Sequence, residues 1–293
     1  MKNLLIQTEE LPAFENINVS DVEPTIDKLL AESRIIVQSL LANTKNYNWD
    51  NLLQTLEDMD DKLNRTWSPA SHLHSVADND QLREAYNNCI SKLSDYSTEM
   101  GQNEELFHAY EQIAGADSFK FLSTAQQKIV TNSLRDFQLS GIALDTKAKE
   151  RYKLIQQQLS KLQTKFEENL LDATHAWRKL ITDKDELEGL PESCIELAAQ
   201  TAKDVGKEGW IFTLEFPSYM PVMQYADNAS LREEIYGAYV TRASEKGPNA
   251  GQFDNSEIMN KILQYRTEKA KLLGFESYAH YSLATKMAEN TNE

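Results

Sequence analysis

The 293-residue chain contains 46 acidic and 30 basic residues, a formal net charge of −16, which argues against nucleic acid as a partner because binding a phosphate backbone requires a basic face. With only 10 glycines and 7 prolines, tight turns are few and a mainly α fold is expected. No stretch reaches the ~18–20 consecutive apolar residues of a membrane span. The start of the chain turns polar at residues 7–10, before a secretory apolar core could form, so a cytoplasmic protein without membrane contact is expected.

Apolar residues at helical spacing predict helices through the first two thirds of the chain. Ser20 and Glu23 form a capping-box pattern, so the first helix should begin there and end within residues 43–48. A second helix carries Leu52 to Leu63 and should stop before Ser68-Pro69, because a residue preceding proline is pushed out of the α region. Further helices are expected over residues 78–101, 103–115, 124–140 and 146–181.

The last third contains the only segment whose composition favours a strand. Residues 210–217 cluster β-branched and aromatic side chains, which predicts one short strand or a hairpin near 210–225. Its partner is expected either at residues 222–225 or outside this chain, so we expect it to be the least self-sufficient element. Helices are expected to open at Pro191 and to cover residues 230–244, 256–273 and 276–288.

Histidine spacing provides no sign of a zinc peptidase site within the chain. Such a site requires the pattern His-Glu-x-x-His, which places two imidazoles on one helical turn with a glutamate base between them. The sequence lacks this pattern, and no two histidines are four positions apart. On a helix, His72 and His74 would point in different directions, so we interpret them as surface or packing residues. The five histidines are His72, His74, His108, His175 and His280.

Three other sequence patterns could indicate a functional site, but each has a simpler structural interpretation. Asp58-Met59-Asp60-Asp61 resembles the acid motif of some terpene cyclases, but its amphipathic context favours a solvated helix face. Residues 247–251, Gly-Pro-Asn-Ala-Gly, lack the Lys-Ser/Thr of a phosphate loop and are expected to form an interhelix loop. Cys89 and Cys194 have no CxxC spacing or neighbouring histidine, so they are interpreted as buried apolar side chains.

Several longer runs resemble the amino-terminal part of the thimet-oligopeptidase-like family of zinc metallopeptidases. The similarity extends in order along the whole chain. The runs that carry it lie at residues 68–76 (SPASHLHSV), 134–142 (LRDFQLSGI), 216–223 (FPSYMPVM), 239–244 (YVTRAS), 247–251 (GPNAG), 271–280 (KLLGFESYAH) and 283–288 (LATKMA).

The resemblance implies an amino-terminal helical domain over residues 1–190 and the start of the peptidase region over 191–293. It implies a cytoplasmic enzyme that hydrolyses short peptides, with this part forming a channel wall. Zinc and the His-Glu-x-x-His helix are expected in the carboxy-terminal catalytic half, which would be this chain's partner. No catalytic, substrate-binding or metal residue is therefore assigned, and the chain alone is expected to bind no zinc and to be inactive. A non-catalytic helical peptide-binding or regulatory module is the alternative.

Overall fold

The computed structural model describes residues 4–6 and 11–293, so the polar stretch at residues 7–10 lies outside it. Helices make up 72% of the structure, which confirms the predicted mainly α class. The chain divides into two compact units, one formed by Met1–Lys161 with Tyr265–Glu293 and the other by Leu162–Gln264. This division into compact units differs from the expected domain boundary at residue 190. It does not test that boundary, which stays a prediction.

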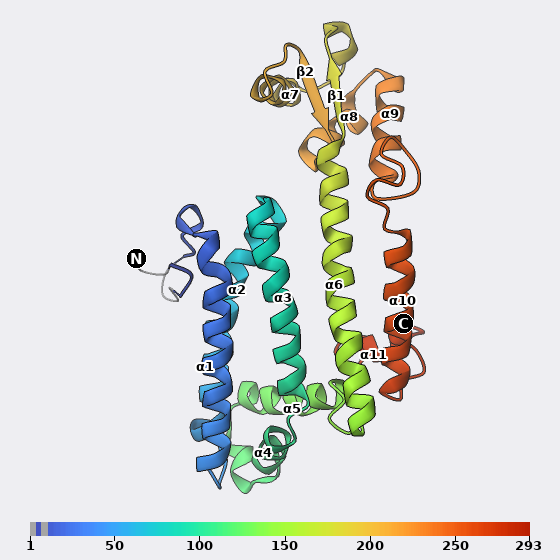
Figure 1. Cartoon of the computed structure of the whole chain (residues 1–293). Coiled ribbons are helices and arrows are strands. Elements are labelled where there is room, and N and C mark those ends of the chain that lie inside the picture. Colours follow the sequence, from blue (N-terminus) through green and yellow to red (C-terminus); the bar gives the residue numbers. More distant parts are fainter. Residues whose placement is uncertain (1–3, 7–10) are drawn as a thin grey trace. The chain divides into compact units, whose positions relative to one another are not determined.

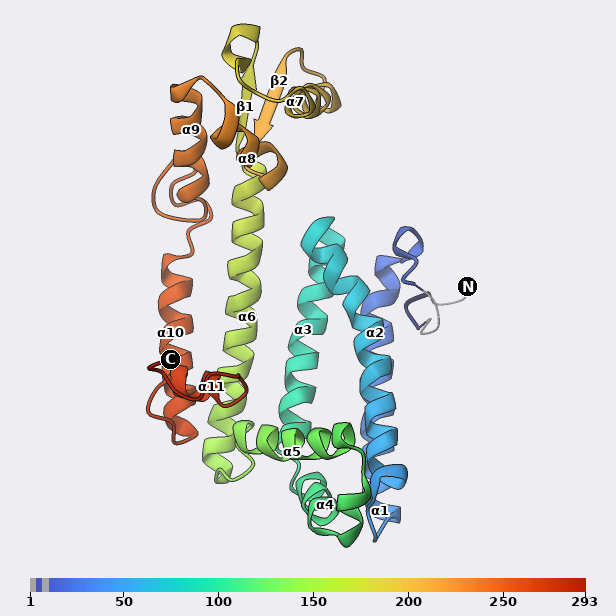
Figure 2. The ribbon, with the colours of Figure 1, turned by 180° about the vertical axis from the view of Figure 1, so that it is seen from behind.

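The first unit is built from helices (Figure 1). In it α1, α2 and α3 pack against one another, and Figure 2 shows α2 on the side opposite to the view of Figure 1. The helices of this unit are α1 (Val22–Asn43), α2 (Gln54–Val76), α3 (Asp80–Gly101), α4 (Glu104–Gly115), α5 (Thr124–Leu139), the first part of α6 (Thr146–Ala176), the last part of α10 (Ser256–Leu272) and α11 (Tyr278–Leu283).

Side-chain caps explain where several of these helices begin. Asn79, Asn103 and Ser123 each accept a hydrogen bond from a backbone N–H in the first turn of the helix that follows, which satisfies a donor that has no partner within the helix. The first cap differs from the prediction. Asn18, not Ser20, caps the chain here, and it begins a short 3₁₀ turn that leads into α1.

Pro69 does not end the second helix as expected. It lies inside α2, which continues to Val76. Proline removes one backbone hydrogen bond and disfavours the preceding α conformation, but Pro69 and the adjacent Ala70 are buried against the core of this unit. Packing therefore outweighs the local penalty.

The second unit contains a small antiparallel sheet covered by helices. Strand β1 pairs with strand β2 so that Arg178 lies opposite Thr213 and Ile181 opposite Trp210. Gly209 precedes β2 with a φ of +109°, and a side chain there would clash with the carbonyl oxygen of Ile181. The elements are the last part of α6, β1 (Arg178–Ile181), α7 (Glu192–Asp204), β2 (Trp210–Thr213), α8 (Phe216–Tyr225), α9 (Ala229–Val240) and the first part of α10.

The sheet corrects two expectations. The helix predicted to reach residue 181 ends at Ala176, and the residues after it form β1. The partner expected at residues 222–225 is instead part of α8, which has a proline in its first turn, a position that proline tolerates well. Because β2 is paired within the chain, the reason for expecting it to be the least self-sufficient element no longer holds.

Separate hydrophobic cores hold the two units. In the first unit, one cluster centres on Leu52, Leu53 and Val130, and another on Ile26 and Leu30. In the second unit, Phe212 and Ile235 are fully buried at the centre of one cluster. Short helical turns complete the described chain, at Leu4–Ile6, Phe14–Asn16, Val19–Asp21, Trp49–Leu53, Asp117–Phe121 and Lys184–Leu187.

The remaining predicted helices are present, but their limits differ: the helix expected over residues 230–244 spans Ala229–Val240. The helix opening at Pro191 begins at Glu192, and the one expected over residues 276–288 is limited to Tyr278–Leu283. Gly141, with a φ of +80°, follows the end of α5 as expected of a helix-terminating glycine. Within the described residues, no helix has both the length and the apolarity needed to cross a membrane.

Candidate functional site

An open pocket of about 380 Å³ lies among α1, α2, α3 and α4 in the first unit. Most of its walls are apolar, because these helices turn their hydrophobic faces toward one another. Its lining residues are Val37, Leu56, Met59, Asp60, Leu63, Asn64, Trp67, Ile90, Leu93, Tyr96, Ser97, Met100, Leu106 and Tyr110.

Asp60 is the one charged residue among those that line this pocket. Its side chain retains solvent access, but the surrounding protein raises the pKa of its carboxyl by desolvation. Burial also raises the pKa of Glu57, with the neighbouring Asp60 and Asp58 adding to the effect. Burial also raises the pKa of Tyr110, another lining residue, to about 12. The pocket therefore suits a ligand with an apolar body and a positively charged or hydrogen-bond-donating group.

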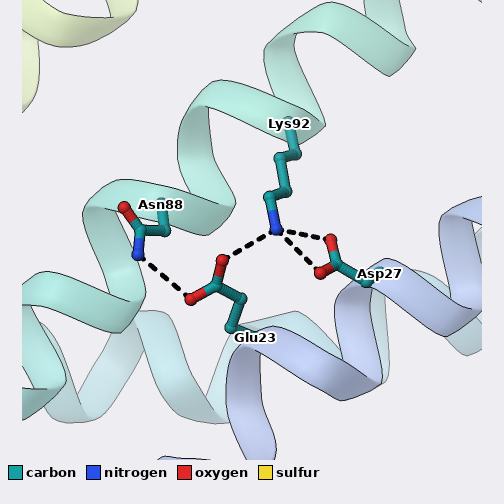
Figure 3. Close-up of polar contacts among 4 residues, drawn as sticks. All are labelled: Glu23, Asp27, Asn88 and Lys92. Atoms are coloured by element: carbon teal, nitrogen blue, oxygen red, sulfur yellow. Dashed lines mark hydrogen bonds and ion pairs between the residues drawn. The ribbon is translucent and has the colours of Figure 1, made fainter.

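A second polar arrangement joins α1 to α3 (Figure 3). Lys92 Nζ donates to Glu23 at 2.8 Å and to both oxygens of Asp27 at 2.6 and 2.8 Å. Asn88 Nδ2 donates to the other oxygen of Glu23 at 3.0 Å. These four side chains are called the Lys92 cluster below.

The cluster shifts the pKa values of its own members. The hydrogen bond from Lys92, followed by that from Asn88, lowers the pKa of Glu23. Burial opposes the charge on Lys92, but the hydrogen bonds to Asp27 and Glu23 outweigh it and raise its pKa. An open groove of about 540 Å³ borders the cluster, and its charged lining residues are Glu23, Asp27 and Glu84. Because Lys92 already pairs with two of these carboxylates, we interpret the cluster as a structural contact between α1 and α3.

The five histidines make separate contacts in the described structure. His72 and His74 both lie on α2, where His74 is buried and stacks on the Tyr86 ring at 3.9 Å while His72 is exposed. His108 Nδ1 is 2.9 Å from Glu111, and His280 Nδ1 is 2.8 Å from the hydroxyl of Ser277. His175 Nε2 lies 3.6 Å from Glu215 in the second unit. No two of them meet in these contacts.

No group of three or more His, Cys, Asp or Glu side chains in the described part of the chain is arranged to hold a metal ion. The described residues therefore do not fit a zinc site, which the family resemblance implies only for the carboxy-terminal half. Cys89 and Cys194 are buried and unpaired, as interpreted from the sequence, and burial raises the pKa of the Cys89 thiol to about 12. The glycine-containing loop at residues 247–251 lies between α9 and α10, as expected.

Sequence reasoning did not identify Asp60 as a pocket residue or Lys92 as a cluster residue. For the cluster, a signal was present: Glu23 and Asp27 are four residues apart on α1, and Asn88 and Lys92 are four apart on α3. Each pair therefore faces one side of its helix. That the two sides face each other depends on how α1 and α3 pack.

Comparison with known proteins shows which family this chain resembles. The model of the neurolysin/thimet oligopeptidase N-terminal domain matches residues 26–149, and the model of peptidase family M3 matches residues 222–293. The chain is therefore similar to the amino-terminal part of proteins of this thimet-oligopeptidase-like family.

Within that family, the chain is similar over all its 293 residues to oligopeptidase A. It is 50% identical to oligopeptidase A of Salmonella typhimurium and 49% identical to that of Escherichia coli, and it covers 43% of each of these proteins. It is 24% identical over 279 residues to the dipeptidyl carboxypeptidase of Escherichia coli, covering 40% of it. The chain thus spans less than half the length of the relatives it matches.

Proposed function

We propose that the chain is the amino-terminal part of a cytoplasmic zinc metallo-oligopeptidase that hydrolyses short peptides. The observation that carries this proposal is the similarity of the whole chain, near 50% identity, to the amino-terminal part of oligopeptidase A. In this role the helices form one wall of a channel that admits peptides and excludes folded proteins. Confinement of this kind accelerates a reaction by restricting the substrate to productive orientations.

The metal and the catalytic groups belong, in this proposal, to another part of the protein. Peptidase family M3 is zinc-dependent in general. Because the described residues contain no group that fits a metal, no step of peptide hydrolysis is assigned to residues of this chain. Its partner would be the carboxy-terminal catalytic half of the same protein.

The pocket in the first unit favours a second candidate function, a non-catalytic peptide-binding module. An apolar cavity of about 380 Å³ with a single carboxylate on its wall suits one side chain of a peptide together with an amine. This candidate requires peptide binding by the chain itself, whereas the oligopeptidase proposal does not.

The test begins with the coding sequence beyond codon 293. An in-frame His-Glu-x-x-His codon pattern some hundreds of codons later supports the oligopeptidase proposal, and the extended protein should then cleave a quenched fluorescent peptide in a chelator-sensitive manner. Replacement of the first histidine of that pattern provides the matched inactive control. A native stop codon directly after residue 293, with peptide binding by the purified chain, would support the binding module instead.

A further inference from the structure

The last turns of α10 carry two cations whose neighbours are aromatic rings. Arg266 and Lys269 are three positions apart and therefore lie on the same side of the helix. The guanidinium carbon of Arg266 lies 5.0 Å from the centroid of the Tyr278 ring. Lys269 Nζ lies 4.6 Å from the centroid of Tyr281 and 5.4 Å from that of Tyr152. All five residues belong to the first unit.

Neither cation has a counter-ion in the part of the chain that the structure describes. Arg266 Nε is buried without a hydrogen-bond acceptor, and the contacts of Lys269 within the described residues are those with the two rings. Acidic residues are nearby but are used elsewhere. Glu268, between the two cations in sequence, accepts two hydrogen bonds from Arg151 at 2.6 and 2.7 Å.

Leaving these charges unpaired is costly. Only 7% of Lys269 is exposed, and an uncompensated buried charge is among the most unfavourable features of a protein interior. Desolvation lowers the pKa of Lys269 to about 8, while arginine remains charged at every pH at which proteins fold. Ring contacts offset part of the cost, but they do not supply the acceptor that Arg266 Nε lacks.

We propose that Arg266 and Lys269 form a binding site for a small oxyanion, a carboxylate or a phosphate, bounded by Tyr152, Tyr278 and Tyr281. An arginine fork and a lysine ammonium are the donors that such anions prefer. Tyr278 and Tyr281 are half-buried, and phenol hydroxyls can donate further hydrogen bonds.

One acidic side chain near Tyr281, on another helix, does not pair with the two cations. Asp136 on α5 is close enough to Tyr281 to raise the pKa of that phenol, after the larger effects of burial and of Tyr278. Its carboxylate is already paired with Arg135 at 2.9 Å. An anion from outside the described residues is therefore needed to neutralise the two cations.

The test is thermal unfolding of the purified chain at pH 7 and constant ionic strength, with two anion probes. Inorganic phosphate tests the phosphate source, and N-acetylglycine tests the carboxylate source, with N-acetylglycinamide as its uncharged control. A ligand that binds only the folded state raises the melting temperature in a saturable manner. We expect such a rise with phosphate or N-acetylglycine and none with the amide.

Substitutions of Lys269 and Arg266 test whether the rise in melting temperature depends on the proposed site. Lys269→Met should weaken the apparent affinity by about ten-fold or more, and Arg266→Gln should do the same. Lys271→Met removes an exposed lysine of the same helix and should leave the response unchanged. Lys269→Met is expected to fold at least as stably as the parent, because it replaces a buried charge with an apolar side chain of similar length. Absence of a saturable rise with either anion, or an equal rise in Lys269→Met and Arg266→Gln, would overturn the proposal.

Discussion

Two lysines of the first unit are in opposite environments. Lys92 bridges two carboxylates between α1 and α3, and these hydrogen bonds raise its pKa. Lys269 on α10 faces two tyrosine rings and has a pKa lowered to about 8 by burial. Both lysines lie where helices contact each other. They differ because Lys92 is paired with carboxylates, whereas the contacts of Lys269 within the described residues are with aromatic rings. The first arrangement is complete by itself, whereas the second is completed by a ligand.

The largest effect is expected from Lys269→Met. Lowering the pKa from 10.5 to about 8 corresponds to a cost of about 3 kcal/mol for holding the charge in the folded state at pH 7. Removing the charge should raise the free energy of unfolding by about 2–3 kcal/mol, measured by urea denaturation. Lys271→Met is the control and should change it by less than about 0.5 kcal/mol. A decrease in stability in Lys269→Met would show that the lysine has a structural partner.

The pH dependence sharpens this comparison. Because the folded state binds its proton on Lys269 less tightly than the unfolded state, the cost is fully present below pH 8 and is relieved as the pH rises toward 10.5. The stability gained by Lys269→Met should therefore be greatest near pH 7 and smaller at pH 9.5. Comparing variant with parent at each pH cancels the titration of the tyrosines and of Cys89, whose raised pKa values act in the opposite direction. A gain that does not change with pH would contradict the charge-burial account.

For the Lys92 cluster, a smaller effect of opposite sign is expected. Lys92→Met should lower the free energy of unfolding by about 0.5–1 kcal/mol, because Lys92 and Glu23 are each about one-third exposed and solvent screens such pairs. The loss should shrink further in about 0.5 M salt. Arg65→Met, which removes a more exposed pair with Asp61, is the matched control and should cost less. If Lys92→Met instead stabilised the protein, the claim that Lys92 is paired favourably and Lys269 is not would be contradicted.

The smallest effect is expected from Asp60→Asn in the pocket. Asp60 is exposed, but partial desolvation by the surrounding protein raises the folded-state pKa of its carboxyl. Its ionised form therefore destabilises the protein slightly, because solvent screens the charge, and this cost disappears as the pH falls and the carboxyl is protonated. The variant should be more stable than the parent by less than about 1 kcal/mol at pH 7 and equal to it at pH 3. Asp58→Asn, on the same helix outside the pocket lining, should show no such gain.

Local signals in the sequence were sufficient for most helices. Asn79, Asn103 and Ser123 are strong caps, and they mark helix starts wherever the following residues have an apolar stripe. The predicted cap at Ser20 was wrong, because Asn18 caps the turn before α1. The predicted helix end before Pro69 was also wrong, because the burial of Pro69 depends on its packing partners. Strand β1 is four residues long and its pairing is with a segment some thirty residues away, so nothing in its own sequence distinguishes it from the end of a helix.

The candidate sites were less predictable, since they depend on contacts between distant helices. Asp60 lies in an acidic run on an amphipathic helix, and only the packing of α1 to α4 makes it part of a pocket wall. Lys269 did carry a readable signal: it lies seven residues after the buried Ile262 and next to the buried Ala270, so a charge occupies an apolar stripe. Its lack of an acidic partner is a property of the folded structure.

The most direct test of the account is the zinc content and peptidase activity of the 293-residue chain by itself. After dialysis against zinc, the chain should hold less than one equivalent of metal and should not cleave a quenched fluorescent peptide, with or without chelator. A catalytic zinc requires three protein ligands and an open position, and the described residues contain no group of that kind. Chelator-sensitive turnover by a preparation free of host peptidases, abolished by replacing the chain's own histidines, would contradict the account.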